Sequence, residues 1–300
     1  MMVRNIAAPA RVSHQRTPVT RTSRGKLIVA LLSALAWTVP SPVAAQAPTP
    51  VGNKQISLFT RDDAYLAAFF IAGTFALAPF DKKLAGDLQQ PNTQANRTFQ
   101  SLATGVRVIA DPGSVIIGTS MYIIGRVGHW QKVADLGLHG EEAILVGTIL
   151  TTGIKWTAGR ARPYTTADTN PRDYQLLRGL RKGRDYASFP SGHTLAAFSA
   201  AAAVTNETSR WWPGSQWYIG PLMFGGATAV GLSRMYNNQH WASDVILGAG
   251  IGTFAGNKVV RFAHRTNPGN RFDRWLLGAT VAPSADGLVF SWSLAPAMLR

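Results

Sequence analysis

Apolar runs of helical length alternate with short polar segments rich in Pro, Gly, Asp and Asn along most of the chain. One such run follows Asp62 and Asp63 and is itself followed by Lys82 and Lys83, an order of charges that suits the helix dipole. The pattern predicts an all-α fold, a bundle of about six or more core helices. The expected helices cover residues 64–80, 115–124, 143–154, 195–204, 219–232 and 245–254.

The N-terminal part of the chain has the layout of an export signal. Residues 1–45 begin with a basic region that ends at Lys26, continue with an apolar stretch over Leu27–Val39, and close on small residues. The apolar stretch is short for a spanning helix, which favours a cleaved signal peptide over an uncleaved anchor. Residues 46–60 then read as a linker. We therefore expect an exported, periplasmic or cell-envelope protein.

The rest of the chain divides into a helical domain over residues 61–275 and a tail over residues 276–300. In the tail, two apolar stretches, 277–281 and 288–294, flank a segment that contains Asp286-Gly287. Asp-Gly between apolar runs is typical of a tight turn joining two strands. The tail therefore predicts a small C-terminal β-hairpin beside the helical domain.

Composition and charge narrow the classes of function. The chain has no cysteine, which excludes disulfides, thiolate metal sites and a cysteine nucleophile. Its formal charge is +15, and residues 155–185 alone carry eight Lys and Arg against three Asp. No nucleic-acid-binding motif is present, and the cations gather around the candidate catalytic residues. An anionic substrate accounts best for this charge, and an anionic membrane surface second.

The first candidate group is a pair of cations at the end of an apolar helix. Lys155 and Arg162 are seven residues apart, so on a continuous helix they share a face, and Pro163 would end that helix at Arg162. Two cations so placed suit an anion-binding site, although surface cations that snorkel past apolar side chains share this pattern. Residues 164–186 predict a long loop.

The second group opens the next apolar helix. Ser191 is a natural helix N-cap, and Gly192 allows a ligand to approach the backbone closely. A helix N-terminus presents free N–H groups and a partial positive charge, which favours a phosphate. His193 would project from the first turn beside that anion.

The third group combines Arg234, His240 and Asp244. The spacing of His240 and Asp244 places them one turn apart on a helix, where the carboxylate can orient the imidazole and leave one ring nitrogen free to attack. Asn237 and Asn238 predict a break between Arg234 and this turn. Taken alone, a surface arginine beside a His-Asp helix pair accounts equally well for the segment.

Together the three groups predict a site for phosphoryl transfer at helix ends. Three cations and a helix N-terminus can surround the phosphoryl oxygens and stabilise the charge of the transition state. His240 would attack phosphorus, while His193 would protonate the leaving oxygen and later activate water. We expect no cofactor and no metal, because the carboxylates are few and the histidines widely separated. The catalytic candidates are His240, His193 and Asp244, and the phosphate-binding candidates are Lys155, Arg162, Ser191, Gly192 and Arg234.

In order and spacing, these motifs resemble the three-part signature of the type 2 phosphatidic acid phosphatase superfamily. Its parts are matched by Lys155 to Pro163, Pro190 to His193, and Ser233 to Asp244. That superfamily also contains bacterial class A acid phosphatases and vanadium haloperoxidases. The resemblance implies an α-helical bundle, a phosphohistidine on His240, and the roles given above for the other residues.

The resemblance implies a metal-independent phosphatase for phosphate monoesters or lipid (pyro)phosphates, and two alternatives stay open. The same pocket could hold vanadate through His240 and act as a haloperoxidase, with vanadate as its cofactor. A non-catalytic membrane protein could instead retain the pocket to bind an anion or lipid. The expected partner is a phosphorylated small molecule or a lipid phosphate. We also expect the protein to associate with a membrane and not to bind nucleic acid.

Overall fold

The computed structural model describes residues 56–165, 170–284 and 287–292, so the expected signal peptide lies outside the described residues. Most of the described chain is helical, which confirms the all-α prediction. The elements in chain order are α2 (Arg61–Leu77), η1 (Ala78–Phe80), α3 (Asp81–Leu88), α4 (Pro91–Gln94), α5 (Arg97–Val108), η2 (Ile109–Gly113), α6 (Ser114–Val127), α7 (Gln131–Ala158), α8 (Arg178–Lys182), η3 (Gly183–Tyr186), α9 (Gly192–Trp211), α10 (Gln216–Tyr236), α11 (Ala242–Arg261), η4 (Phe262–Thr266), α12 (Arg271–Leu277), β1 (Ala279–Ser284) and β2 (Gly287–Trp292).

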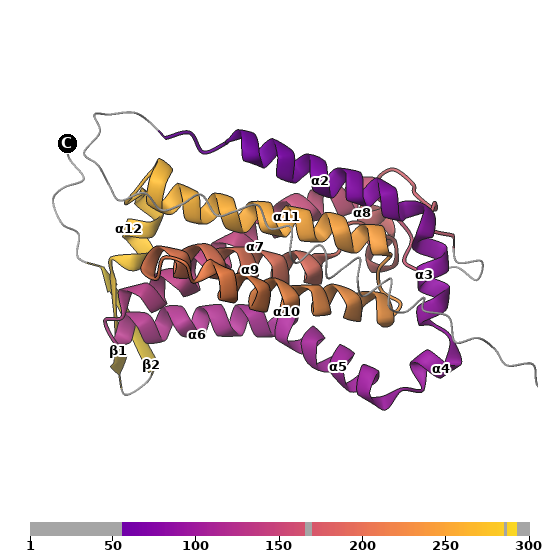
Figure 1. The fold of residues 1–300 in the computed structure, drawn as a ribbon. Coiled ribbons are helices and arrows are strands. Elements are labelled where there is room, and N and C mark those ends of the chain that lie inside the picture. The colour runs from indigo at the N-terminus through magenta and orange to yellow at the C-terminus, as the bar shows by residue number, and fades with distance from the viewer. Residues whose placement is uncertain (1–55, 166–169, 285–286, 293–300) are drawn as a thin grey trace, which may run out of the picture.

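The long helices α2, α6, α7, α9, α10 and α11 run lengthwise along one elongated bundle (Figure 1). Helix α9 packs against α7, α10 and α11, so it lies at the centre of the bundle. Helices α3, α4 and α8 lie at one end, and α12 with the β-hairpin lies at the other (Figure 1). All six predicted helices are present, and each extends beyond its apolar run because polar residues continue the turns at its ends.

Two predicted interruptions are absent from the structure. The helix expected to end at Phe80 passes through the 3₁₀ turn η1 into α3, since Pro79 occupies an early position of that turn, where a missing N–H is tolerated. Among the described residues, the segment Arg61–Leu88 is long and apolar enough to cross a bilayer by length and composition. The turn expected around Asp111-Pro112 is instead the π-helical turn η2, which joins α5 to α6.

The largest apolar core cluster joins four of the long helices. Phe70 of α2, Phe198 of α9, Phe224 of α10 and Ile246 of α11 are buried together, with small alanines between them. The rings of Phe198 and Phe224 meet edge to face with centroids 5.7 Å apart. This packing holds α9, α10 and α11 in a fixed relation, which matters because their ends carry the candidate site.

Glycines on α11 let it approach α9 closely. A Cβ on Gly248 would lie 2.5 Å from the carbonyl oxygen of Ser191, and one on Gly252 would lie 2.4 Å from that of Leu195. Only glycine permits such contact between helix backbones. The start of α9 is therefore fixed against the start of α11.

The tail forms the expected β-hairpin. Strands β1 and β2 pair antiparallel, with Ser284 opposite Gly287. The pairing begins two residues later than predicted, because Leu277 still belongs to α12. The hairpin lies at the end of the bundle away from the candidate site (Figure 1).

Candidate active site

The residues that the sequence analysis assigned to the site come together at one end of the bundle. The Nζ of Lys155 donates to the carbonyl oxygen of Ala187 (3.1 Å), and it lies 3.9 Å from the position of a Cβ on Gly192. The backbone N–H of Ser191 donates to the carbonyl oxygen of Asp244 (3.0 Å). The eight residues lie at or beside the C-terminal ends of α7 (Lys155, Arg162) and α10 (Arg234) and the N-terminal ends of α9 (Ser191, Gly192, His193) and α11 (His240, Asp244).

Arg162 does not share a helical face with Lys155, contrary to prediction. Helix α7 ends at Ala158, because Gly159 takes a left-handed conformation (φ 54°, ψ 39°) and turns the chain out of the helix. Arg162 then reaches the site from the extended segment that follows. Its Nε donates to the carbonyl oxygen of Arg184 (2.8 Å), which orients the guanidinium.

Replacing Gly159 with alanine should destabilise the protein by about 2–4 kcal/mol, because a left-handed alanine is strained and its Cβ would lie 2.1 Å from the Gln175 carbonyl oxygen. Gly153 of α7 is the matched control, since its Cβ would meet nothing within 4 Å. Gly153→Ala should be neutral or stabilising, by up to about 1 kcal/mol. Denaturant unfolding of both variants measures the difference, and equal effects would contradict this explanation of the helix end.

At the start of α9, Ser191 occupies the N-cap position, as predicted, and is fully buried. Its hydroxyl does not cap the backbone N–H groups, however. It accepts a hydrogen bond from the Thr194 hydroxyl (2.9 Å). The first N–H groups of α9 are therefore not capped by this side chain, and Gly192 and the half-buried His193 form the first turn.

His240 lies just before helix α11 and not in its first turn, which corrects the prediction. The chain leaves α10 after Tyr236, and Asn238 takes a positive φ of 56°, which confirms the predicted break. Trp241 is the N-cap of α11, and its N–H donates to Oδ2 of Asp244 (2.9 Å). The Nδ1 of His240 lies 3.5 Å from the same oxygen, so Asp244 faces the imidazole while it caps the helix.

Arg162 and Arg234 are both buried, and Gln239 is hydrogen-bonded to each of them. The Nη1 of Arg162 donates to the backbone (3.2 Å) and side-chain (3.1 Å) oxygens of Gln239. The N–H of Gln239 in turn donates to the carbonyl oxygen of Arg234 (3.0 Å). The turn that carries His240 is thus tied to two of the candidate phosphate ligands.

The positive charges at this end of the bundle act on one another and on the imidazole. Burial, together with the charges of Lys155 and Arg162, lowers the pKa of His240 to about 3 despite the nearby Asp244. Burial, with Arg162 and Arg234, lowers the pKa of Lys155 to about 8. The site therefore combines a neutral imidazole with a region of strong positive potential, as an anion-binding site requires.

A buried network that the sequence did not predict anchors Asp244. Arg160 donates through Nη1 to Asp244 and to the Ser243 hydroxyl (2.8 Å), and through Nη2 to Asp81 (2.7 Å). The Ser188 hydroxyl donates to Oδ2 of Asp244. Burial alone would raise the pKa of Asp244, but Arg160 and its other partners outweigh it and hold the pKa below its usual range. No local pattern marks Asp81, which looks like one charge among those that follow an apolar run.

The chain is similar to known proteins over part of its length. Residues 142–268 match the PAP2 superfamily. The chain is 35% identical over 133 residues to a lipid A 1-phosphatase of Porphyromonas gingivalis, a match that covers 44% of this chain and 24% of that protein. It is 29% identical over 150 residues to an undecaprenyl-diphosphatase of Sulfolobus acidocaldarius, covering 49% of this chain and 68% of that protein.

Among solved structures, the transmembrane PAP2-type phosphatidylglycerolphosphate phosphatase from Bacillus subtilis superposes with a TM-score of 0.49 at 20% identity, covering 70% of this chain and 99% of that one. The matched residues, 142–268, include every candidate site residue. They carry the three motifs in the order and spacing that the sequence analysis found. Over residues 142–268 the chain is therefore similar to the PAP2 superfamily.

Proposed function

We propose that this protein is a phosphatase that hydrolyses a lipid phosphate or diphosphate through a phosphohistidine intermediate. The observation that carries the proposal is the convergence of three cations and the start of α9 on a buried, neutral His240. Lys155, Arg162 and Arg234 would hold the non-bridging oxygens, and the N–H groups around Ser191 and Gly192 would add to them. In this proposal the cations take the place of a metal ion.

In the first step, Nε2 of His240 attacks phosphorus, since Nδ1 faces Asp244. The bond between phosphorus and the leaving oxygen breaks, and that oxygen takes a proton from His193. In the second step, water attacks phosphorus while His193 takes up a proton, and the bond to Nε2 breaks to release phosphate. Asp244 orients the imidazole and offsets the positive charge that develops on it.

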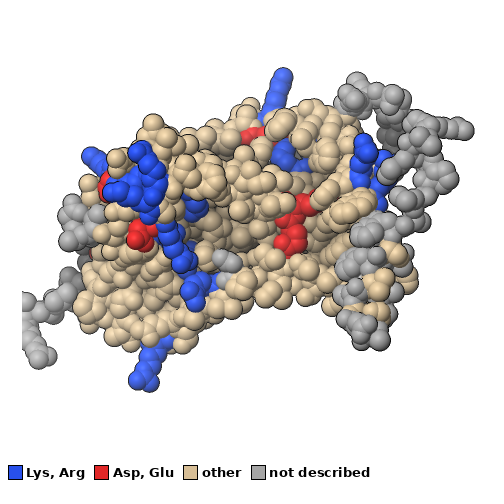
Figure 2. Space-filling model, turned by 180° about the vertical axis from the view of Figure 1, so that it is seen from behind, with Lys and Arg blue, Asp and Glu red and all other residues tan. Residues whose placement is uncertain are grey.

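Exposed apolar side chains on several helices support a lipid substrate. Phe75 of α2 is 73% exposed, Ile149 of α7 is 64% exposed and Leu222 of α10 is 70% exposed. Figure 2 shows one face of the molecule largely as uncharged surface, with Lys and Arg gathered mainly toward one end. Apolar surface of this extent on a folded protein indicates contact with lipid or with another protein. We infer that the bundle is membrane-associated.

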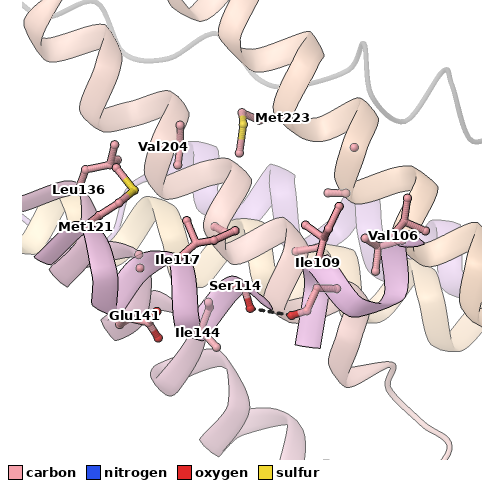
Figure 3. Close-up of a pocket in the computed structure, with 18 of the residues that line it drawn as sticks. Val106, Ile109, Ser114, Ile117, Met121, Leu136, Glu141, Ile144, Val204 and Met223 are labelled. Carbon is pink, nitrogen blue, oxygen red and sulfur yellow. Dashed lines mark hydrogen bonds between the residues drawn. The ribbon is translucent and has the colours of Figure 1, made fainter. Parts of the chain in front are cut away.

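A lateral cavity supplies a place for an apolar chain. It has a volume of about 280 Å³ and lies between α5, α6, α7, α9 and α10. Side chains of Ile117, Met121, Val204 and Met223 lie around it (Figure 3). Its lining extends to Val230, one helical turn before Arg234. A lipid whose phosphate lies among the cations could place part of its tail in this cavity.

The relatives support the same class of substrate, since their names specify a lipid A phosphate and undecaprenyl diphosphate. The chain spans only 24% of the first of these proteins, so the substrate assignment is part of our proposal. Export to the cell envelope, which we infer from residues 1–45, is part of the same proposal. Export would bring the enzyme to the compartment where such lipids occur.

The proposal is tested by measuring phosphate release from the full chain in detergent. We expect release from a lipid A 1-phosphate, undecaprenyl diphosphate or phosphatidic acid, with kcat/KM well above that for a water-soluble aryl phosphate. Equal kcat/KM for soluble and lipid substrates would contradict the proposal that the substrate is a lipid. Vanadate-dependent halide oxidation without phosphate release would support the haloperoxidase alternative.

The pH profile of kcat/KM should be bell-shaped, with an alkaline limb that falls through about pH 8 because Lys155 loses its charge there. The acid limb set by His240 should appear only near pH 3, where the imidazole of the free enzyme becomes protonated. Lys155→Arg should move the alkaline limb upward by more than one pH unit, since a guanidinium stays charged. The substrate ionises in the same way with the wild type and with Lys155→Arg. An alkaline limb that does not move would therefore show that a group other than Lys155 sets it.

A further inference from the structure

The described residues that could share a metal ion lie at the end of the bundle opposite to His240. His139 of α7, Glu207 of α9 and His264 of η4 meet there. The Nδ1 of His139 lies 2.6 Å from Oε1 of Glu207, and the Nε2 of His264 lies 2.7 Å from the same oxygen. Glu207 comes sixteen residues after Ser191 in the chain, which along α9 is about 24 Å.

The three side chains are held in orientation by neighbours. The far ring nitrogen of His139, Nε2, lies 3.6 Å from Oδ2 of Asp273. The second oxygen of Glu207 accepts from Nη1 of Arg210 (2.9 Å). The rings of His139 and His264 are nearly perpendicular, at 87°, with centroids 4.9 Å apart. A carboxylate behind a ligating imidazole is the usual outer contact of a metal-binding histidine.

The charge of this region also favours a cation. His139 and Glu207 are fully buried, and Asp135, Glu142 and Asp273 lie close enough to interact with them. Within the described part of the chain, four carboxyl groups thus lie around two imidazoles and the guanidinium of Arg210. Buried carboxylates in such number need compensating positive charge, which protons on the imidazoles or a bound cation can supply.

We propose that His139, Glu207 and His264 bind a divalent transition-metal ion, with Zn²⁺ the preferred ion. Two imidazoles and one carboxylate form a ligand set that suits Zn²⁺, with water or the second carboxylate oxygen completing four-fold coordination. All three ligand atoms lie within 4.8 Å of one another. An ion at about 2.1 Å from each would replace the two hydrogen bonds and widen the two N···O distances, 2.6 and 2.7 Å, by less than about 1 Å.

Such an ion would cross-link three elements. It would join α7, α9 and η4 at the end of the bundle where α12 and the hairpin lie (Figure 1). It would act on stability and not on the phosphoryl chemistry, since the two sites lie at opposite ends of α9. The inference therefore does not depend on the proposed function.

The test is zinc binding by the full chain, purified in detergent through a tag without histidine. After treatment with EDTA, the protein is loaded with ZnCl₂ and desalted, and its zinc is counted by elemental analysis. We expect one zinc per wild-type chain and none in His264→Gln, whose amide still donates to Glu207 but is a poor zinc ligand. His240→Ala should keep its zinc, which places the ion away from the phosphate site.

Zinc should also raise the unfolding temperature of the wild type and of His240→Ala but not that of His264→Gln. Co²⁺ in place of Zn²⁺ should give the visible absorption bands of a four-coordinate ion in the wild type, which tests the site even if His264→Gln does not fold. Equal zinc in wild type and folded His264→Gln, or a folded wild type with no zinc and no Co²⁺ bands, would overturn the proposal.

Discussion

Replacing His240 with alanine should lower kcat for phosphate release by roughly 10⁴-fold or more. The proposed mechanism passes through a bond between His240 and phosphorus, so no step remains once the imidazole is gone. The surrounding cations would still stabilise charge, but they cannot supply a nucleophile. Release of phosphate from the best lipid substrate, followed with time, measures the loss.

Binding of inorganic phosphate separates this role from a loss of structure. Lys155, Arg162 and Arg234 are unchanged in His240→Ala, and Asp244 keeps its contact with Arg160. The variant should therefore bind phosphate within about tenfold of the wild-type affinity while its turnover is lost. Turnover close to that of the wild type would rule out the phosphohistidine mechanism. Loss of both binding and helicity would mean that the variant is misfolded, and His240→Asn would then replace it.

Replacing Arg160 with methionine should destabilise the protein by about 3–5 kcal/mol, because breaking a buried ion pair leaves the partner charge uncompensated. Arg160 is 2% exposed and contacts two fully buried carboxylates, those of Asp81 and Asp244. Methionine fills much of the same volume without the charge. Denaturant unfolding in detergent measures the change in free energy.

The surface pair Lys83–Asp87 is the matched control, with side chains 55% and 35% exposed. Lys83→Met should change stability by less than about 1 kcal/mol, since exposed ion pairs contribute little. Adding Asp81→Asn to Arg160→Met should recover part of the lost stability, because one of the two uncompensated carboxylate charges is removed. Similar effects of Arg160→Met and Lys83→Met would show that the buried network is not needed for stability.

The fold was largely predictable because each buried helix has its own run of apolar residues in the sequence. The apolar runs over residues 195–204 and 245–254 are local patterns, and they mark the cores of α9 and α11. Helix ends were less predictable. Pro79 looks like a terminator, yet the chain continues through a 3₁₀ turn, since whether a proline ends a helix depends on the packing around it.

The candidate site divides in the same way. Arg234, His240 and Asp244 could be grouped from the sequence because they lie within one short segment. Their geometry could not, since the cap that Asp244 forms with Trp241 places His240 outside the helix. Gly159 similarly ends α7 before Arg162, so Arg162 does not lie on the helical face predicted for it.

The helical architecture, the residues that carry the three motifs and the excess of positive charge around them could all be predicted from the sequence. These are properties of residue type and of short-range spacing. Two contacts depend on how the helices pack in space. Arg160 joins Asp81 to Asp244, and His139, Glu207 and His264 meet at the far end of the bundle. Such contacts join residues 57 to 84 positions apart, and helix packing alone brings them within reach.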